Sequence, residues 1–269
     1  MNPEYVSLDY LSLAITLVMV GIAILFSIIE KLKEEWNIVL ATVRTAAQLL
    51  AVGFVLGKVF ESELWYVVLG TLIIMNLFAG FDAARKVGNF KSFLMVTVSI
   101  AISASFTLFV LIILVIKPDV WFEPAFLIAL GGMIMGNTMN AASLFLGFVK
   151  EDLANRKAEV EGLLSLGATA AQAASMSIKA GLRQAITPVM NSMMIVGIVF
   201  LPGMMVGQLS VQGVLPIDAA KYQIMIMYML LGATSITVWI LSKLSLKLFF
   251  NSNLQLIAGI KQKKTSKDN

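Results

Sequence analysis

The sequence contains no cysteine and no histidine, and charged residues make up only 13% of its 269 positions. Without cysteine, disulfides, thiolate metal sites and cysteine nucleophiles are excluded. Without histidine, the chain lacks the commonest metal ligand and the commonest general base near neutral pH. Soluble proteins carry about 25% charged residues, so this chain has too little charge to cover a water-facing surface. The composition therefore excludes a soluble enzyme and a nucleic-acid-binding domain.

Apolar residues make up 59% of the chain, and its mean hydropathy is +0.89. A bilayer core about 30 Å thick needs about 20 apolar residues for each helix that crosses it. We therefore predict an all-α, polytopic membrane protein that forms one transmembrane domain over residues 1–269, with about seven spanning helices. The predicted spans are residues 11–29, 38–59, 64–81, 93–116, 124–149, 185–205 and 222–241.

The basic residues predict how the chain is oriented, because positive charge is retained on the cytoplasmic side. With the N-terminus outside, only Lys58, Lys117 and Lys221 fall on the outer side of the membrane. The prediction is N-outside and C-inside, with a cytoplasmic loop at 150–183 and a cytoplasmic basic tail at 251–269. We expect a multi-pass protein of the cell membrane, the bacterial inner membrane.

The loop at 150–183 is the longest predicted segment that does not span. Within it, residues 163–182 are rich in small residues and are predicted to form a helix on or below the cytoplasmic surface, because the basic clusters on both sides belong inside. Residues 161–169 combine an acidic start, a short apolar face and a glycine break. Such a helix can bind a groove of a soluble partner, or it can rest on lipid headgroups as a connector.

The sequence has no G-x-x-x-x-G-K-[ST] phosphate-binding loop. The nearest match, Gly53 to Val59, has its glycines one residue too close together and ends a predicted span. Any energy for transport must therefore come from another chain or from an ion gradient.

Two polar residues of the second predicted span, Arg44 and Gln48, lie four positions apart and share a face. An arginine inside the membrane costs several kcal/mol unless it faces inward and finds a partner. Asp82 and Glu30, each at the inner end of a predicted span, are the expected partners. A clamp between helix ends and a role in gating both remain open.

The fifth predicted span carries a stripe of small and polar residues at helical spacing. Its members are Gly132, Gly136, Asn140, Ser143 and Gly147, with Asn137 beside them. The stripe favours close helix packing, including self-association, or it lines a substrate path. Asn76 and Asn191 belong to other spans and are candidates for the same interior.

Leu201, Pro202 and Gly203 interrupt the end of the sixth predicted span. A break there is typical of an ordinary helix end, or of a re-entrant stretch through Gln208 that forms an outer gate.

Several short motifs together resemble one family over nearly the whole chain. They are residues 44–50, 136–140, 161–169, 187–191, 201–208 and 220–224. These motifs resemble the membrane subunits of iron-export ABC transporters, a family that also includes plant aluminium-resistance permeases. The spacing of Glu161 and Gly167 is also similar to the cytoplasmic loop of ABC permeases, whose coupling helix meets the ATPase.

This resemblance implies a permease subunit that exports metal ions, namely iron, pairs with a separate ABC ATPase and forms a homodimer. ATP and magnesium would be bound by the ATPase, so no cofactor and no catalytic residue is expected on this chain. The expected ATPase-coupling residues are Glu159, Glu161, Gly162, Leu163, Leu166, Gly167, Ala168 and Thr169. The expected path or gating residues are Arg44, Gln48, Asn76, Asp82, Asn137, Asn140, Asn191 and Gln208.

Two other functions remain open from the sequence. A secondary transporter driven by an ion gradient needs an acidic residue near the middle of a span, and the nearest candidate, Asp82, is peripheral. A membrane assembly scaffold would also use glycine stripes and an amphipathic loop. No cluster of hard oxygen ligands is evident, so the metal-binding residues are unknown and iron follows from the resemblance alone.

Overall fold

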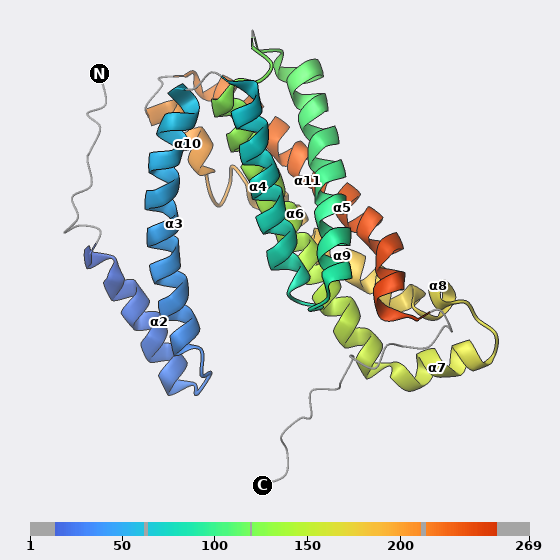
Figure 1. The fold of residues 1–269 in the computed structure, drawn as a ribbon. Helices are drawn as coiled ribbons and strands as arrows, with labels where there is room; N and C mark the ends of the chain where they lie inside the picture. Colours follow the sequence, from blue (N-terminus) through green and yellow to red (C-terminus); the bar gives the residue numbers. More distant parts are fainter. Residues whose placement is uncertain (1–13, 62–63, 119, 211–213, 252–269) are drawn as a thin grey trace. The chain divides into compact units, whose positions relative to one another are not determined.

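The computed structural model describes residues 14–61, 64–118, 120–210 and 214–251 (Figure 1). The chain divides into two compact units, residues 1–63 with 210–213, and residues 64–209 with 214–269. Throughout the described ranges the regular elements are helices, and the only β-type pairing there is an isolated bridge between Val196 and Phe200. The predicted all-α class is therefore confirmed.

The first unit contains α2 (Leu17–Ile29) and α3 (Glu35–Glu61). The Ser27 hydroxyl holds the turn between them, because it donates to Glu35 Oε1 at 2.7 Å and accepts from the Glu34 amide at 3.2 Å. Ser27 is the buried residue of α2, whereas the side chains of α3 are almost all uncovered by protein. An apolar helix of this length needs lipid or another protein surface around it.

The second unit begins with α4 (Trp65–Ala84) and α5 (Phe90–Phe109), and α5 continues as a π-helical stretch, η1 (Val110–Ile116). The long helix α6 (Pro124–Asn155) follows, and then three shorter helices, α7 (Lys157–Ser165), α8 (Ala170–Ala173) and α9 (Ser175–Ile195). The last two helices are α10 (Gly203–Ser210) and α11 (Pro216–Phe249). Both α6 and α11 start with proline, which suits the first turn of a helix because its amide has no partner there.

The core of the second unit forms around α6, which packs against α4, α5, α9 and α11 (Figure 1). Its centre includes the fully buried Phe145, Leu130 and Ile100. Glycines allow the helices to come close, because a backbone without Cβ can touch a neighbouring side chain directly. A Cβ on Gly80 of α4 would lie 2.0 Å from Thr97 Oγ1 of α5.

Among the described residues, five helices are long and apolar enough to cross a membrane, whereas the sequence predicts about seven spans. The five helices are α3, α4, α5 with η1, α6 and α11. The first predicted span, residues 11–29, corresponds to α2, a shorter apolar helix of 13 residues. Residues 11–13 of that prediction lie outside the described ranges.

The sixth predicted span, residues 185–205, is wrong as a single helix. Helix α9 ends at Ile195, and the chain reverses through Gly197, which has φ +83. The Gly197 amide donates to the Phe200 carbonyl at 2.9 Å, which closes a tight turn before α10. The break thus comes before Pro202 and Gly203, because a left-handed glycine ends the helix first.

The predicted surface helix over residues 163–182 is also wrong as one element. Its first part belongs to the end of α7 and to α8, and its last part opens α9, which packs against α6 and α11. Ser177 and Gly181 of α9 are buried, and a Cβ on Gly181 would lie 2.5 Å from Val149 Cγ2 of α6. The small residues Ser177 and Gly181 therefore serve close helix packing.

Candidate functional site

Helix α7 follows α6 directly and turns away from it (Figure 1). Its buried residue is Val160, at 1% exposure. Glu159, Leu163 and Leu166 are spaced four and three apart, so they lie along one side of the helix. Leu163 is 36% exposed and Leu166 is 87% exposed. This side of α7 therefore presents one acid, the largely uncovered Leu166 and the partly covered Leu163.

Gly167 ends α7 in a left-handed conformation, with φ +88. Its amide donates to the Leu164 carbonyl at 3.0 Å, and the Ala168 amide donates to the Leu163 carbonyl at 3.0 Å. This pair of bonds is a Schellman motif, which favours glycine because any Cβ is strained there. The glycine break seen in the sequence is therefore the C-terminal stop of α7, and it follows directly after Leu166.

Thr169 starts α8 through a capping box with Gln172. The Thr169 hydroxyl accepts from the Gln172 amide at 3.3 Å, and the Gln172 side-chain oxygen accepts from the Thr169 amide at 2.8 Å. Both orphan amides at this helix start are thereby satisfied. The expected coupling residues 161–169 thus comprise the end of α7, its glycine stop and the cap of α8, with Gly162 on the exposed side of α7.

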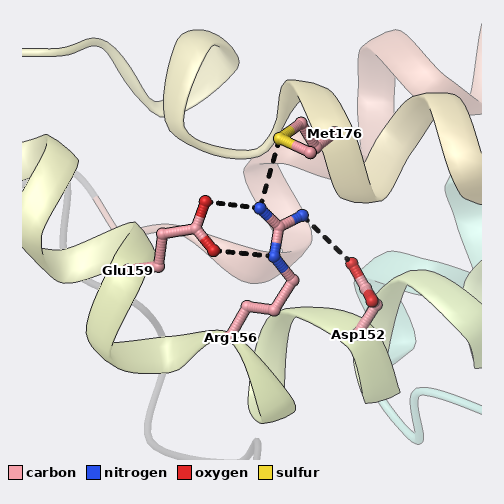
Figure 2. A network of polar contacts seen from close by, with 4 residues as sticks. All are labelled: Asp152, Arg156, Glu159 and Met176. Carbon is pink, nitrogen blue, oxygen red and sulfur yellow. Dashed lines mark hydrogen bonds and ion pairs between the residues drawn. The ribbon is translucent and has the colours of Figure 1, made fainter.

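Arg156 lies between α6 and α7 and contacts three helices (Figure 2). Its guanidinium donates two hydrogen bonds to the Glu159 carboxylate, one of them from Nε at 2.9 Å. It also lies 3.7 Å from Asp152 of α6, and it donates to Met176 Sδ of α9 at 3.2 Å. Neither Arg156 nor Met176 was among the predicted site residues, although Asp152 four positions before the arginine and Glu159 three positions after it are visible in the sequence.

Arg156 and Glu159 change each other's pKa. The hydrogen bonds from Arg156 lower the pKa of the Glu159 carboxyl below its ordinary 4.5. The same hydrogen bonds are the main cause of a raised pKa for Arg156. Both residues are thus ionised near neutral pH, which strengthens their hydrogen bonds. The neighbouring Lys157 and Glu161 form a looser pair, 3.6 Å apart and more than half exposed on each side.

Asn76 is the most deeply buried of the expected path residues for which the structure gives exposure, at 9%. Its Nδ2 donates to the Thr97 carbonyl of α5 at 3.3 Å, and its Oδ1 has no hydrogen-bond partner among the described residues. Asn76 also lines a cavity of about 370 Å³ between α4, α5, η1 and α6, whose other walls are mainly apolar. A single amide in apolar surroundings cannot replace the hydration shell of a bare metal ion.

The other path candidates of the second unit are separate from Asn76. Asn137 Nδ2 donates to the Met133 carbonyl of its own helix at 2.9 Å, and Asp82 lies 3.8 Å from Arg85 at the end of α4. Asn140 and Asn191 are exposed on α6 and α9. Across the described ranges no hydrogen bond joins these side chains to one another. Their shared role in a path stays a prediction.

The stripe on α6 is only partly used for packing in this chain. A Cβ on Gly132 would lie 3.0 Å from Met75 Cε of α4, whereas a Cβ on Gly136 or Gly147 would meet nothing within 4 Å. The stripe therefore packs against α4 at Gly132 and is open at Gly136 and Gly147. Self-association and a path lining both stay open for it.

The remaining path candidates lie on α3 and α10. Arg44 and Gln48 are exposed on α3, and within the described part of the first unit Arg44 forms no ion pair with Glu30. Gln208 belongs to α10, but its side chain lies outside the described residues. The described residues contain no group of three or more acidic, histidine or cysteine side chains that could hold a metal ion.

Residues 10–250 match the uncharacterised protein family UPF0014. The chain belongs to this family. It is 36% identical to the probable iron export permease protein FetB of Escherichia coli strain K12, over 94% of this chain and 96% of FetB. It is 30% identical to the protein ALUMINUM SENSITIVE 3 of Arabidopsis thaliana, over 90% of this chain and 88% of that protein. No solved structure matches the chain.

Among the members of UPF0014 is also the membrane protein YjkA of Bacillus subtilis strain 168, 33% identical over 93% of this chain. The expected relationship to an iron-export permease and to a plant aluminium-related protein is thereby confirmed. With several helices able to cross a bilayer, this UPF0014 protein is a multi-pass cell membrane protein.

Proposed function

We propose that this chain is the membrane permease subunit of an ABC transporter that exports metal ions, with iron as its expected cargo. A separate ATPase subunit supplies the energy, and α7 is the coupling helix that docks on it. The observation that carries the proposal is the largely uncovered Leu166, next to the partly exposed Leu163, at the end of a short, charged helix that Gly167 terminates. Membership of UPF0014, with its probable iron export permease FetB, supports the cargo.

The leucines of α7 fit a protein groove better than the lipid surface. Full burial of one leucine stabilises a complex by about 1.5–3 kcal/mol, so the exposed Leu166 provides an effective anchor and the partly covered Leu163 adds to it. Glu159 and Glu161 lie beside them and balance the charges of Arg156 and Lys157, so α7 lacks the excess of basic residues that an anionic inner leaflet attracts. An apolar groove on the ATPase is therefore the expected binding site.

Transport then follows from the connection of α7 to the long helices. Closure of two ATPases around ATP and magnesium moves α7, and α6 tilts with it because the two helices adjoin at Arg156. Coupling requires that the ATPases bind the two permease conformations with different free energies. Two copies of the chain complete the path, and the open part of the α6 stripe, with Gly136 and Asn140, is the surface offered for packing or for lining it.

The docking role is tested by Leu166→Asp, with Ser165→Asp as the matched control one residue away. Both positions are exposed at the end of α7, so neither change removes a buried side chain. The tagged permease is purified with the Walker-motif ATPase, and the retained ATPase is quantified. We expect Leu166→Asp to lower ATPase affinity by at least about tenfold and Ser165→Asp to lower it far less.

Equal ATPase retention by wild type and Leu166→Asp would contradict docking through α7. The cargo is tested in proteoliposomes that contain both subunits, with a screen of metal ions for ATP-dependent transport. Movement of metal ions driven by a proton or sodium gradient, without any ATPase, would instead identify a secondary transporter.

A further inference from the structure

Helix α7 needs an anchor outside its own backbone. It has nine residues, and helices this short are marginal in water. At its junction with α6, Arg156 has φ −100 and ψ +21, which is not helical, and no side chain caps the new helix start. The backbone therefore allows α7 to point in more than one direction.

By contrast, α6 and α9 form a tight pair. Gly181 of α9 lies against α6 so closely that a Cβ would be 2.5 Å from Val149 Cγ2 and 3.2 Å from the Phe145 ring. Close packing of this kind leaves little freedom between two helices. Any movement of α7 relative to the membrane helices is therefore a movement against the α6–α9 pair.

We propose that Arg156 is the positioning residue that holds α7 in a fixed direction on the α6–α9 pair. Its guanidinium binds Glu159 of α7 through two hydrogen bonds, lies 3.7 Å from Asp152 of α6 and donates to Met176 Sδ of α9 at 3.2 Å (Figure 2). Arg156 and these three partners form the Arg156 clamp. Each partner belongs to a different helix, so the clamp restrains α7 from two sides at once.

The chemistry of the clamp requires arginine. The planar guanidinium presents several donors in a rigid fork, whereas a lysine ammonium is a single point of charge on a flexible stem. The side chains of Arg156 and Asp152 are each 25% exposed, whereas Glu159 is about as exposed as Glu161. Solvent therefore competes less for the guanidinium than for the Lys157 ammonium, and the rigid fork fixes the direction of its hydrogen bonds.

A fixed α7 gives the coupling helix its function as a lever. If the ATPase pulls on Leu163 and Leu166, a clamped α7 transmits the movement to α6, and a loose α7 pivots at Arg156 without moving it. This role in coupling rests on the proposed function, whereas the restraint on α7 does not. The two are tested by separate measurements.

The restraint is measured as a distance distribution between spin labels. The chain has no cysteine, so Ser165→Cys on α7 and Lys179→Cys on α9 can be labelled in an otherwise unchanged protein. Labelled chains are diluted with unlabelled chains, so that only distances within one copy are recorded. Arg156→Gln and Glu159→Gln remove the clamp, Arg156→Lys keeps its charge, and Lys157→Gln is the control for loss of a neighbouring charge.

We expect Arg156→Gln and Glu159→Gln to widen the distance distribution at least about twofold, with Arg156→Lys in between and Lys157→Gln unchanged. Glu159 is the more exposed partner, so Glu159→Gln removes the ion pair with little effect on folding. It keeps the test valid if Arg156→Gln lowers the amount of folded protein. An unchanged width in both variants, or equal widening by Lys157→Gln, would overturn the clamp.

The role in coupling is measured as metal ions transported per ATP hydrolysed. We expect Arg156→Gln to retain the ATPase, because Leu163 and Leu166 remain, but to transport about tenfold less per ATP. Full transport by a variant with a widened distribution would overturn the lever. A wild-type permease that binds no ATPase would refute the proposed function, and the spin-label distances would still decide on the clamp.

Discussion

Small residues are abundant in two regions of this protein, and they do different things in each. In the helical core, Gly80 contacts Thr97 directly, and Ser103 of α5 shares a hydrogen bond with Thr237 of α11. In the segment from α7 to α8, Gly167 and Thr169 end one helix and start the next. Small residues therefore permit close packing in the core, because they occupy little volume between two helices. Outside the core glycine permits turns, because it adopts left-handed backbone angles without strain.

The largest expected effect is in the core, for Gly80→Ala. Its Cβ would lie 2.0 Å from Thr97 Oγ1 and 3.1 Å from Thr97 Cα, so the backbones of α4 and α5 would have to separate. We expect a loss of about 3 kcal/mol in unfolding free energy, measured by denaturant titration in detergent. Gly136→Ala is the control because its Cβ would meet nothing within 4 Å, and an equal loss there would refute the close approach of α4 and α5.

A smaller effect is expected for Gly167→Ala in the α7 segment. Alanine in the left-handed region costs about 1 kcal/mol or more, which corresponds to about fivefold faster hydrogen exchange of the α7 amides. Gly162→Ala should slow that exchange by a similar factor, because glycine inside a helix costs up to about 1 kcal/mol relative to alanine and nothing lies within 4 Å of the new Cβ. If both changes shift the exchange in the same direction, the helix stop at Gly167 is wrong.

Thr237→Val tests the buried hydroxyls of the core. The variant loses the hydrogen bond to Ser103, which is worth about 0.6 kcal/mol for an average interhelical bond in a membrane protein. Thr234 is as deeply buried, but its hydroxyl has no partner among the described residues, so Thr234→Val should be neutral or stabilising. Denaturant titration of the two variants side by side distinguishes them, and an equal loss would contradict the assigned bond.

The smallest effect is expected for a change of pH near neutrality on the direction of α7. Because Arg156 lowers the pKa of Glu159 below 4.5, the clamp is complete above that value and is lost only as pH falls through the lowered pKa. The α7 to α9 spin-label distances should therefore be unchanged between about pH 8 and about pH 6 and widen toward about pH 3. Glu159→Gln should show no such acid-dependent widening, and widening of the wild type near pH 6 would show that another group controls α7.

Much of the architecture could be predicted from the sequence. Helices α3, α4, α5, α6 and α11 match predicted spans, because uninterrupted apolar runs of this length have few other stable structures in lipid. The glycine of α7 was also visible as a break. Helix α9 was predicted as parts of two separate helices, residues 163–182 and 185–205, because Lys179 and Gln184 make the stretch between them polar. Its packing against α6 and α11 explains why one helix continues through this stretch.

The candidate site was predicted in part. The exposed Leu163 and Leu166 belong to the motif that the sequence singled out, whereas the Arg156 clamp depends on Met176, which is 20 positions away. The path residues were chosen as polar groups in apolar runs, and the structure places Asn76 in the core but leaves Asn140 and Asn191 uncovered within this chain. Polarity alone does not tell which face of a helix a residue occupies.

The sequence by itself determined that this protein is helical, lies in a membrane and belongs to a family whose members include a probable iron export permease. Those properties follow from composition, run length and short motifs, which are local. Only the tertiary structure decided that Gly80 packs on Thr97, that Gly181 packs on Val149 and that Arg156 joins three helices. Helices that are apolar on nearly every side give no periodicity to mark the packed face, so which faces meet depends on the fit between side chains distant in the sequence.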